Sequence, residues 1–294
     1  MPGRALIHEA ALRGGHYDTE QHRRRRDVLR DTLACFDAEG DRLAALAADN
    51  LARWAADSEA APPRPAAIAR GDWGAVTERL TRSYGRTFAV LNMANAYLPG
   101  GRYVEGTAAQ EENMFRRTDC HFSIAAEHLH HGRYTPEMSR LLNGEDGRFL
   151  LDRERPRTCI RGPEERGPEE RGPGERGDGR GELRGYARLP DDRIFSFYEL
   201  RAAARNCNRE GVDLDDTRRR VRALLDTLVD AGQRHAVLGA WGCGAFANPP
   251  REVARSFRDE LAARSDAFDC VVFAIHDPGY GPDNARVFEE VFGA

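Results

Sequence analysis

Short apolar runs alternate with helical patterns from residue 87 onward, and this alternation constrains the fold more than any other feature. Four runs rich in β-branched and aromatic residues predict buried strands: Thr87–Asn92, Ile194–Glu199, His235–Ala240 and Asp269–Ile275. An apolar stripe predicts a helix between the last two runs, with Asn248 as its cap and Pro249 in its first turn. A strand–helix–strand unit of this length forms a parallel crossover. We therefore expect an α/β fold in which helices cover a mostly parallel sheet.

The N-terminal part of the chain has a different, helical pattern. Apolar residues between Leu43 and Trp54 recur at three- and four-residue steps, and Gly40 breaks this helix from the one before it. Prolines at 62, 63 and 65 indicate a loop, and a short helix follows to Tyr84. We expect a helical extension at residues 1–84, packed on the α/β domain at residues 85–294.

A tract of tandem repeats interrupts the α/β pattern. Arg161–Gly185 contains Arg-Gly-Pro-Glu-Glu twice and Arg-Gly-Pro-Gly-Glu once, followed by further Gly and charged residues. Such a composition buries too little apolar surface to offset the entropy lost on ordering. We predict a flexible insertion at residues 161–185. The run Arg23–Arg26 is interpreted as a solvated helix face, with an anion-binding patch as the alternative.

Composition excludes several classes of function. The 294-residue chain has no lysine, so all 44 basic residues are arginines, and lysine-dependent phosphate loops and Schiff bases are excluded. A net charge of −4 and a pI near 6.2 argue against dedicated nucleic-acid binding. Six scattered cysteines are typical of reduced thiols. No apolar run reaches the length of a membrane span, and we expect a cytoplasmic protein.

The first segment that could carry chemistry is Asn92–Glu112, which begins where a predicted strand ends. Ligands of α/β folds bind at such ends. Gly100 and Gly101 allow the backbone to approach a ligand closely. A helix follows, in which Thr107 is expected to form a capping box with Gln110. The next two residues are glutamates, either catalytic carboxylates or partners of the helix dipole.

The second segment is His235–Pro250, a strand followed by a glycine-rich loop and a helix. Gly242 and Gly244 expose backbone N–H groups at a helix entrance, which is suited to a diphosphate. The spacing only approximates the dinucleotide fingerprint, since no acidic residue ends the next strand. Phe246 is placed to stack on a sugar or base unless it is core, and Cys243 is interpreted as a small buried residue instead of a nucleophile.

A third segment, Phe273–Asn284, also follows a strand. His276 and Asp277 could contact a ligand, but a turn is the simpler interpretation of Asp-Pro-Gly. The histidines at 128, 130 and 131 lack a partner motif, so we predict no metal site.

Two of these segments together resemble microbial-type poly(ADP-ribose) glycohydrolases. The family signature is three glycines followed by Gln-Glu-Glu, matched by Gly100, Gly101 and Gln110-Glu111-Glu112. The stretch Gly242–Pro250 is similar to the second ligand loop of that family. The resemblance covers about residues 17–158 and 186–294. It implies a three-layer α/β/α, macrodomain-like mixed sheet with an N-terminal helical extension.

The resemblance also implies roles for these residues in hydrolysing ribose–ribose bonds of poly(ADP-ribose). Glu112 would be the general acid, and Glu111 would orient the ribose hydroxyls. The glycine loops would enclose the diphosphate, and Phe246 would pack on the distal ribose. The residues expected to bind substrate are Asn95, Gly100, Gly101, Gln110, Gly242, Cys243, Gly244, Ala245, Phe246 and Asn248. No metal or cofactor is implied.

One departure from the signature is Arg102, which stands where the family has its third glycine. This departure leaves open a preference for mono-ADP-ribosyl linkages on protein or nucleic acid. The alternatives from other classes are an ADP-ribose-binding macrodomain reader, a nicotinamide-dependent oxidoreductase and arginine-driven nucleic-acid binding. A reader would need the glycine loops but not Glu112.

Overall fold

The structure is a computed structural model that describes residues 19–58, 66–167, 183–277 and 281–293. The predicted loop at Pro62, Pro63 and Pro65 lies outside these ranges. No helix within the described ranges combines the length and the apolar composition needed to cross a membrane.

A six-stranded mixed sheet forms the centre of the molecule, in the order β1-β10-β9-β2-β8-β5. Its strands are β1 (Ala67–Arg70), β2 (Ala89–Met93), β5 (Leu150–Cys159), β8 (Phe195–Ala202), β9 (His235–Leu238) and β10 (Cys270–Ile275). All neighbouring pairs are parallel except β5 and β8, which are antiparallel. The parallel strands therefore end at one common edge of the sheet.

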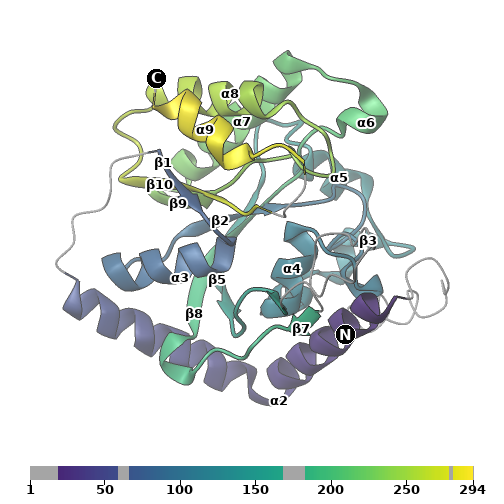
Figure 1. The fold of residues 1–294 in the computed structure, drawn as a ribbon, viewed down its shortest axis with the longest axis vertical. Coiled ribbons are helices and arrows are strands. Elements are labelled where there is room, and N and C mark those ends of the chain that lie inside the picture. Colours follow the sequence, from purple (N-terminus) through teal and green to yellow (C-terminus); the bar gives the residue numbers. More distant parts are fainter. Residues whose placement is uncertain (1–18, 59–65, 168–182, 278–280, 294) are drawn as a thin grey trace, which may run out of the picture.

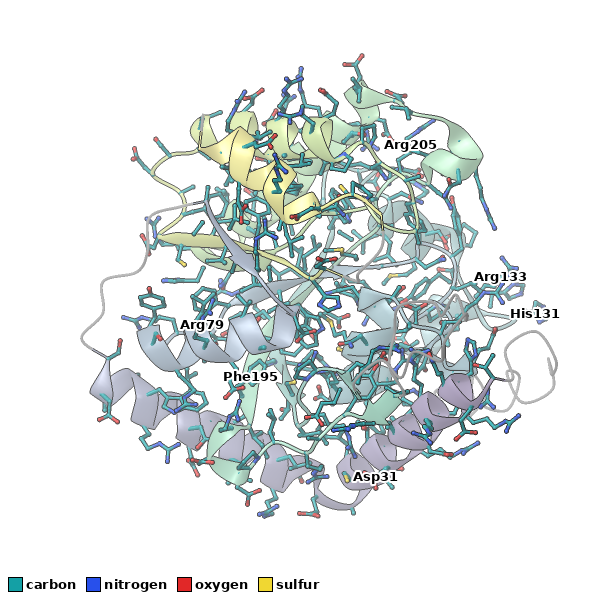
Figure 2. All side chains as sticks on the ribbon, viewed as in Figure 1. Asp31, Arg79, His131, Arg133, Phe195 and Arg205 are labelled. Atoms are coloured by element: carbon teal, nitrogen blue, oxygen red, sulfur yellow. The ribbon has the colours of Figure 1, made fainter. Side chains whose placement is uncertain are left out.

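Helices cover both faces of this sheet (Figure 1). On one face lie α2 (Glu20–Asp57), α3 (Trp73–Tyr84) and α4 (Gln110–Arg117), and on the other α7 (Leu214–Asp230), α8 (Pro250–Ala262) and α9 (Asn284–Phe292). Each layer encloses its own apolar core, and Phe195 at the start of β8 lies in the core between the sheet and α2 (Figure 2). The predicted three-layer α/β/α arrangement is confirmed.

Shorter elements fill the connections between the large ones. The α-helices among them are α5 (Pro136–Leu142) and α6 (Cys207–Glu210). The 3-10 turns are η1 (Tyr103–Glu105), η2 (Asp119–Ser123), η3 (Ala126–His128) and η4 (Asp191–Arg193). Two small antiparallel pairs are β3 (Leu129–His130) with β4 (Arg133–Tyr134), and β6 (Glu165–Arg166) with β7 (Leu183–Gly185).

The N-terminal region differs from the prediction of an all-helical extension. Residues Ala67–Arg70 form β1, an edge strand that pairs with β10, and α3 packs on the sheet. Only four residues long and partly exposed, β1 carries no clear apolar pattern. The helical extension is therefore α2, with a kink at Glu39 (φ −135°, ψ 18°) beside the predicted break at Gly40.

The two ends of the repeat tract have regular structure. Residues 165–166 pair with residues 183–185 as β6 and β7, and both Arg161 and Leu183 are buried. The expectation of a flexible insertion does not hold for these ends, because they pack against α2 and gain partners that the sequence does not reveal. Residues 168–182 lie outside the described ranges.

Close packing of Gly85 against α2 allows a test of how the helical extension contacts the domain. Gly85 ends α3 with φ 58°, and a Cβ there would lie 2.2 Å from the Cα of Ala55 in α2. Gly85→Ala should therefore destabilise the protein by clearly more than the ~1–2 kcal/mol of left-handed strain. Gly147→Ala is the matched control, because Gly147 has φ 75° and nothing within 4 Å of its Cβ position. Equal losses of unfolding free energy in urea would contradict the close contact.

Candidate active site

The predicted loops leave the sheet at neighbouring strand ends. β2 pairs with β9 in parallel, and β9 pairs with β10. A Cβ on Gly239, just beyond β9, would lie 2.4 Å from Met93 Cε and 3.0 Å from the Ala274 carbonyl oxygen. The ends of β2, β9 and β10 thus meet at one place. The loops after β2 and β9 start side by side there.

Two glycines bring the first loop onto the glutamates of α4. Gly100 and Gly101 have φ values of 66° and 61°. A Cβ on Gly101 would lie 2.5 Å from Glu112 Oε1 and 3.1 Å from Glu111 Oε2, so no larger residue fits there. Arg102 has φ −115°, which does not require glycine, and its guanidinium pairs with Glu105 at 3.1 Å. The backbone therefore accepts arginine where the family signature has its third glycine.

Gln110 fastens the start of α4 to β2. Its side-chain oxygen accepts a hydrogen bond from Met93 N at 2.9 Å, and its nitrogen donates to the Leu91 carbonyl at 2.8 Å. The predicted capping box of Thr107 and Gln110 is wrong, because the helix begins at Gln110 itself. These two bonds fix Gln110 against the strand, and its substrate contact stays a prediction.

Glu112 closes the first turn of α4 and is buried. Its Oε2 accepts a hydrogen bond from Ala109 N at 3.1 Å. Its Oε1 accepts hydrogen bonds from Arg102 N at 3.0 Å and from Thr107 Oγ1 at 3.2 Å. One short loop thus supplies all three donors and fixes the carboxylate against the glycine turn.

Glu111 is also buried but has fewer partners. Its Oε2 accepts a hydrogen bond from Asn95 N at 2.8 Å, whereas its buried Oε1 has no partner among the described residues. Burial, and then the charge of Glu112, raise the pKa of Glu111 well above its ordinary value, although the Asn95 amide and Arg201 oppose them. The two neighbouring glutamates therefore have different environments.

Asn95 shapes the turn between β2 and the glycines. Its side-chain oxygen accepts hydrogen bonds from Tyr97 N at 2.9 Å and Leu98 N at 3.0 Å, and its own N–H binds Glu111. Asn95 therefore shapes this corner, and its sugar contact stays a prediction.

The second loop follows β9 and exposes backbone donors. Gly244 and Ala245 are exposed and Phe246 is half-buried. The N–H groups of these three consecutive residues donate no hydrogen bond within the described part of the chain. Gly242 has φ 74°, and a Cβ there would lie 2.5 Å from Asn248 Nδ2. Adjacent free N–H groups of this kind are suited to an anion.

Cys243 and Asn248 stabilise the structure of this loop. Cys243 is 7% exposed, and burial raises the pKa of its thiol to about 12, which agrees with a buried residue instead of a nucleophile. The prediction that Asn248 caps the following helix is wrong. Its side chain donates to the carbonyls of Arg205 and Gly242, and α8 begins at Pro250. Asn248 therefore holds the loop in shape.

Sequence reasoning missed a buried ion pair behind α4. Arg201 Nε and Nη2 both lie 2.9 Å from the Glu199 carboxylate. Arg201 also donates to Tyr134 Oη at 3.0 Å and to Ser123 Oγ at 2.7 Å, while Asn92 Nδ2 donates to Glu199 at 2.7 Å. The only signal in the sequence is two charged residues, Glu199 and Arg201, beside an apolar run.

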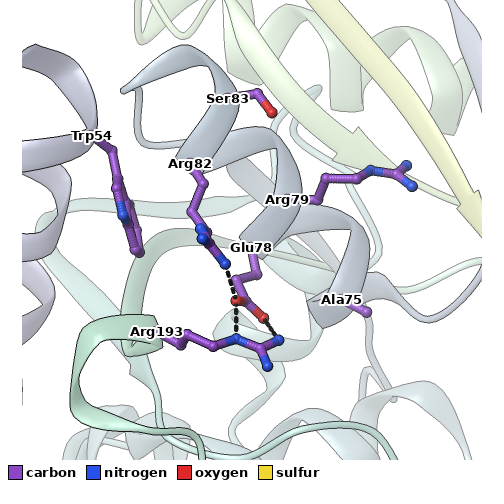
Figure 3. A pocket seen from close by; sticks show the side chains of 7 residues that line it. All are labelled: Trp54, Ala75, Glu78, Arg79, Arg82, Ser83 and Arg193. Atoms are coloured by element: carbon purple, nitrogen blue, oxygen red, sulfur yellow. Dashed lines mark hydrogen bonds and ion pairs between the residues drawn. The ribbon is translucent and has the colours of Figure 1, made fainter. Parts of the chain in front are cut away.

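A hollow of about 460 Å³ lies elsewhere, and Figure 3 shows its side chains. Its lining residues are Trp54, Ala75, Glu78, Arg79, Arg82, Ser83 and Arg193. Arg193 and Arg82 both point to Glu78, at 2.6 and 3.5 Å. Because α3 runs from the end of β1 to the start of β2, this hollow lies toward the edge where strands begin. It is not part of the two-loop site.

Comparisons with known proteins support the resemblance. Residues 15–140 match the family model described as microbial-type PARG, catalytic domain, where PARG is poly(ADP-ribose) glycohydrolase. This match includes the glycine turn and all of α4. No curated protein sequence matches the chain.

Solved structures of such enzymes share the fold. PARG from Thermomonospora curvata has a TM-score of 0.56 and 24% identity, over 91% of this chain and 99% of that one. Its complex with the inhibitor ADP-HPD has a TM-score of 0.55 and 23% identity, over 90% and 98%. PARG from Deinococcus radiodurans in complex with ADP-ribose has a TM-score of 0.51 and 24% identity, over 85% and 91%. The predicted resemblance and macrodomain-like fold are confirmed.

The environment of Glu111 predicts how stability depends on pH. Above about pH 4 a glutamate is ionised in the unfolded chain, whereas the raised pKa keeps Glu111 neutral in the folded chain. Wild-type stability therefore falls as the pH rises from about 4 toward the raised pKa of Glu111 in the folded chain. The glutamine of Glu111→Gln does not titrate. The Tm of this variant should therefore exceed the wild-type Tm by little near pH 4 and by more at higher pH. Exposed Glu154→Gln should show no such trend, and a constant or negative difference for Glu111→Gln would contradict the assignment.

Proposed function

We propose, from the family match over residues 15–140 and the geometry of the two loops, that this chain hydrolyses ribose–ribose glycosidic bonds of poly(ADP-ribose) and releases ADP-ribose. One observation carries this proposal above the others. Two buried carboxylates on the first turn of α4 meet a left-handed glycine turn at the end of a parallel strand. Water is the second substrate, and the reaction needs no redox cofactor.

Glu112 is the general acid in this proposal. It donates a proton to the ribose oxygen that leaves as the bond to the anomeric carbon breaks, and water then attacks that carbon. The resulting Glu112 carboxylate accepts the proton that the attacking water loses. Its three hydrogen bonds from Arg102, Thr107 and Ala109 hold the carboxyl in one orientation, which supports this role.

Glu111 binds the ribose whose glycosidic bond breaks. Its unpartnered Oε1 is buried beside the glycine turn, where a sugar hydroxyl would satisfy it. A neutral carboxyl can both donate and accept a hydrogen bond, so it suits a hydroxyl group well. Glu111 and Glu112 thus have separate tasks, although they are adjacent in the sequence.

The diphosphate of the substrate lies between the two loops in this proposal. The free N–H groups of Gly244, Ala245 and Phe246 are suited to bind its oxygens. The turn at Gly100 and Gly101 lets the backbone approach from the other side. Phe246 then contacts the distal ribose with its half-buried ring. This division assigns anion binding to backbone atoms and bond cleavage to side chains.

The proposed setting is the cytoplasm. Free thiols are typical of a reducing compartment, and all six cysteines are free, four of them buried. The proposed partners are poly(ADP-ribose) and ADP-ribosylated macromolecules.

The test replaces the proposed acid. Glu112→Gln keeps the shape of the side chain but has no proton to donate, so hydrolysis of poly(ADP-ribose) should slow by about 10²–10⁴-fold. The Kd for ADP-ribose should stay close to the wild-type value, because backbone amides bind the diphosphate. Product release by chromatography measures the rate, and calorimetry measures the affinity. Glu154→Gln, an exposed glutamate on the edge strand β5, should match wild type in both.

Three outcomes would count against the proposal. An unchanged rate in Glu112→Gln would remove the acid assignment. Wild-type protein that binds ADP-ribose but hydrolyses no polymer would indicate a reader. Cleavage of mono-ADP-ribosylated protein but not of polymer would place the activity on another linkage.

A further inference from the structure

We propose that α2 and the ordered ends of the repeat tract form a clamp that positions the general acid, with Glu164 as its central positioning residue. The clamp is made of Arg25 and Arg26 of α2, Arg161 and Glu164 of the first repeat, and Tyr186 after β7. This inference rests on the proposed function, because it concerns how Glu112 is held.

Arginines bind three consecutive peptide carbonyls in the loop before α4. Arg26 Nη1 donates to the Glu105 carbonyl at 3.2 Å, and Arg25 Nη1 donates to the Gly106 carbonyl at 3.3 Å. The side chain of Arg116 in α4 donates to the Thr107 carbonyl. Two of these arginines belong to the run 23–26, which the sequence analysis interpreted as a solvated face. Arg25 and Arg26 instead fix the backbone of this loop, whereas Arg23 is exposed.

The backbone of the loop also contacts α2 directly. Gly106 has φ 84°, and a Cβ there would lie 2.3 Å from the His22 carbonyl oxygen. No side chain can separate the loop from the helix at this position. Any movement of the N-terminal turns of α2 is therefore passed to residues 105–107.

Glu164, together with Tyr186, links Arg25 of α2 to Arg116 of α4. Its carboxylate accepts hydrogen bonds from Arg25 Nε at 2.8 Å and Nη2 at 3.1 Å, and from Tyr186 Oη at 2.6 Å. Tyr186 Oη also accepts a hydrogen bond from Arg116 Nε at 3.4 Å. Burial alone would raise the pKa of Glu164, but the hydrogen bonds and charges of its partners lower it to about 2. The carboxylate is therefore ionised between its cationic partners.

Arg161 fastens the same repeat to α2. It donates to Thr32 Oγ1 at 2.8 Å and to the Tyr186 carbonyl at 2.8 Å, and it pairs with Asp31. Figure 2 shows Asp31 on α2. Thr32 Oγ1 in turn donates to the Arg116 carbonyl at 2.7 Å. The Arg and Glu of the first Arg-Gly-Pro-Glu-Glu repeat are thus both used in docking.

The clamped loop ends at the general acid. Thr107 Oγ1, Ala109 N and Arg102 N, which hold Glu112, flank the three carbonyls that the arginines bind. Buried ion pairs often add little net stability, because desolvation offsets their attraction. The convergence of three arginines on the carbonyls of one short loop is better explained by positioning. A misplacement of about 1 Å at a reacting group can cost ~10²-fold in rate.

The experiment compares two neighbouring glutamates of the same repeat. Glu164→Gln removes the charge that holds Arg25, whereas Glu165→Gln changes an exposed side chain. Glu164→Gln should lower kcat on poly(ADP-ribose) by about 10- to 10²-fold, with KM and the Kd for ADP-ribose close to wild type. Glu165→Gln should leave all three unchanged. Equal effects of the two variants, or a parallel loss of ADP-ribose affinity in Glu164→Gln, would overturn the proposal.

A double variant separates positioning from general damage. Glu164 acts through Glu112, so Glu164→Gln should cause no further loss of rate in a Glu112→Gln background. The same fold loss in both backgrounds would overturn the clamp while leaving the acid assignment intact. An unchanged rate in Glu112→Gln alone would instead refute the proposed function.

A milder variant covers the case in which Glu164→Gln does not fold. Tyr186→Phe removes only the hydroxyl between Glu164 and Arg116. It keeps the aromatic ring, whose centroid lies 5.9 Å from Arg116 Cζ. It should lower kcat with KM unchanged while thermal stability stays near wild type. A folded Tyr186→Phe protein with wild-type kcat would overturn the proposal.

Discussion

The site depends on how the first turn of α4 is tied to the strand before it. Three consecutive side chains each bind a different stretch of backbone: Gln110 binds β2, Glu111 binds the turn at Asn95, and Glu112 binds the loop at residues 102–109. Without these bonds the N–H groups of Met93, Asn95, Arg102 and Ala109 would lose these partners. The same polar side chains thus satisfy backbone N–H groups and, for the two glutamates, serve in the proposed hydrolysis.

This arrangement has an electrostatic cost that the surrounding residues reduce. Two carboxylates lie close together beside Gly101, and repulsion and burial both favour a neutral Glu111. Arg201 lies behind them, but it is shared with Glu199. Glu112 is stabilised by donors from its own loop, so that loop must be held in place. The arginines of α2 and the first repeat meet that requirement from outside the sheet.

Sequence patterns predicted the parts of the fold that depend on local periodicity. The strands at β2, β8, β9 and β10 and the helices α3 and α8 lie within a few residues of their predicted positions. The two site loops follow neighbouring parallel strands, as expected from a crossover fold. Both loops depend on glycines with positive φ, which sequence reasoning can recognise.

Features that depend on distant partners were not predictable in this way. Thr107 and Asn248 looked like helix caps, but Thr107 donates to the Glu112 side chain and Asn248 to a carbonyl of its own loop, and the helices begin later. The charged residues of β8 form an internal pair, whereas a hydropathy pattern treats charge as the end of a strand. The first repeat docks on α2, where Glu164 pairs with Arg25 and Arg161 donates to Thr32. The pairings of Glu164 with Arg25 and of Arg161 with Thr32 join positions more than a hundred residues apart and leave no local signal.

The most direct measurement is a crystal structure of the Glu112→Gln protein with ADP-ribose. Our account predicts that the diphosphate lies between Gly100–Gly101 and the amides of Gly244–Phe246, with the terminal ribose hydroxyls on Glu111. A ligand that contacts only one loop, or that occupies the hollow beside Trp54, would contradict it.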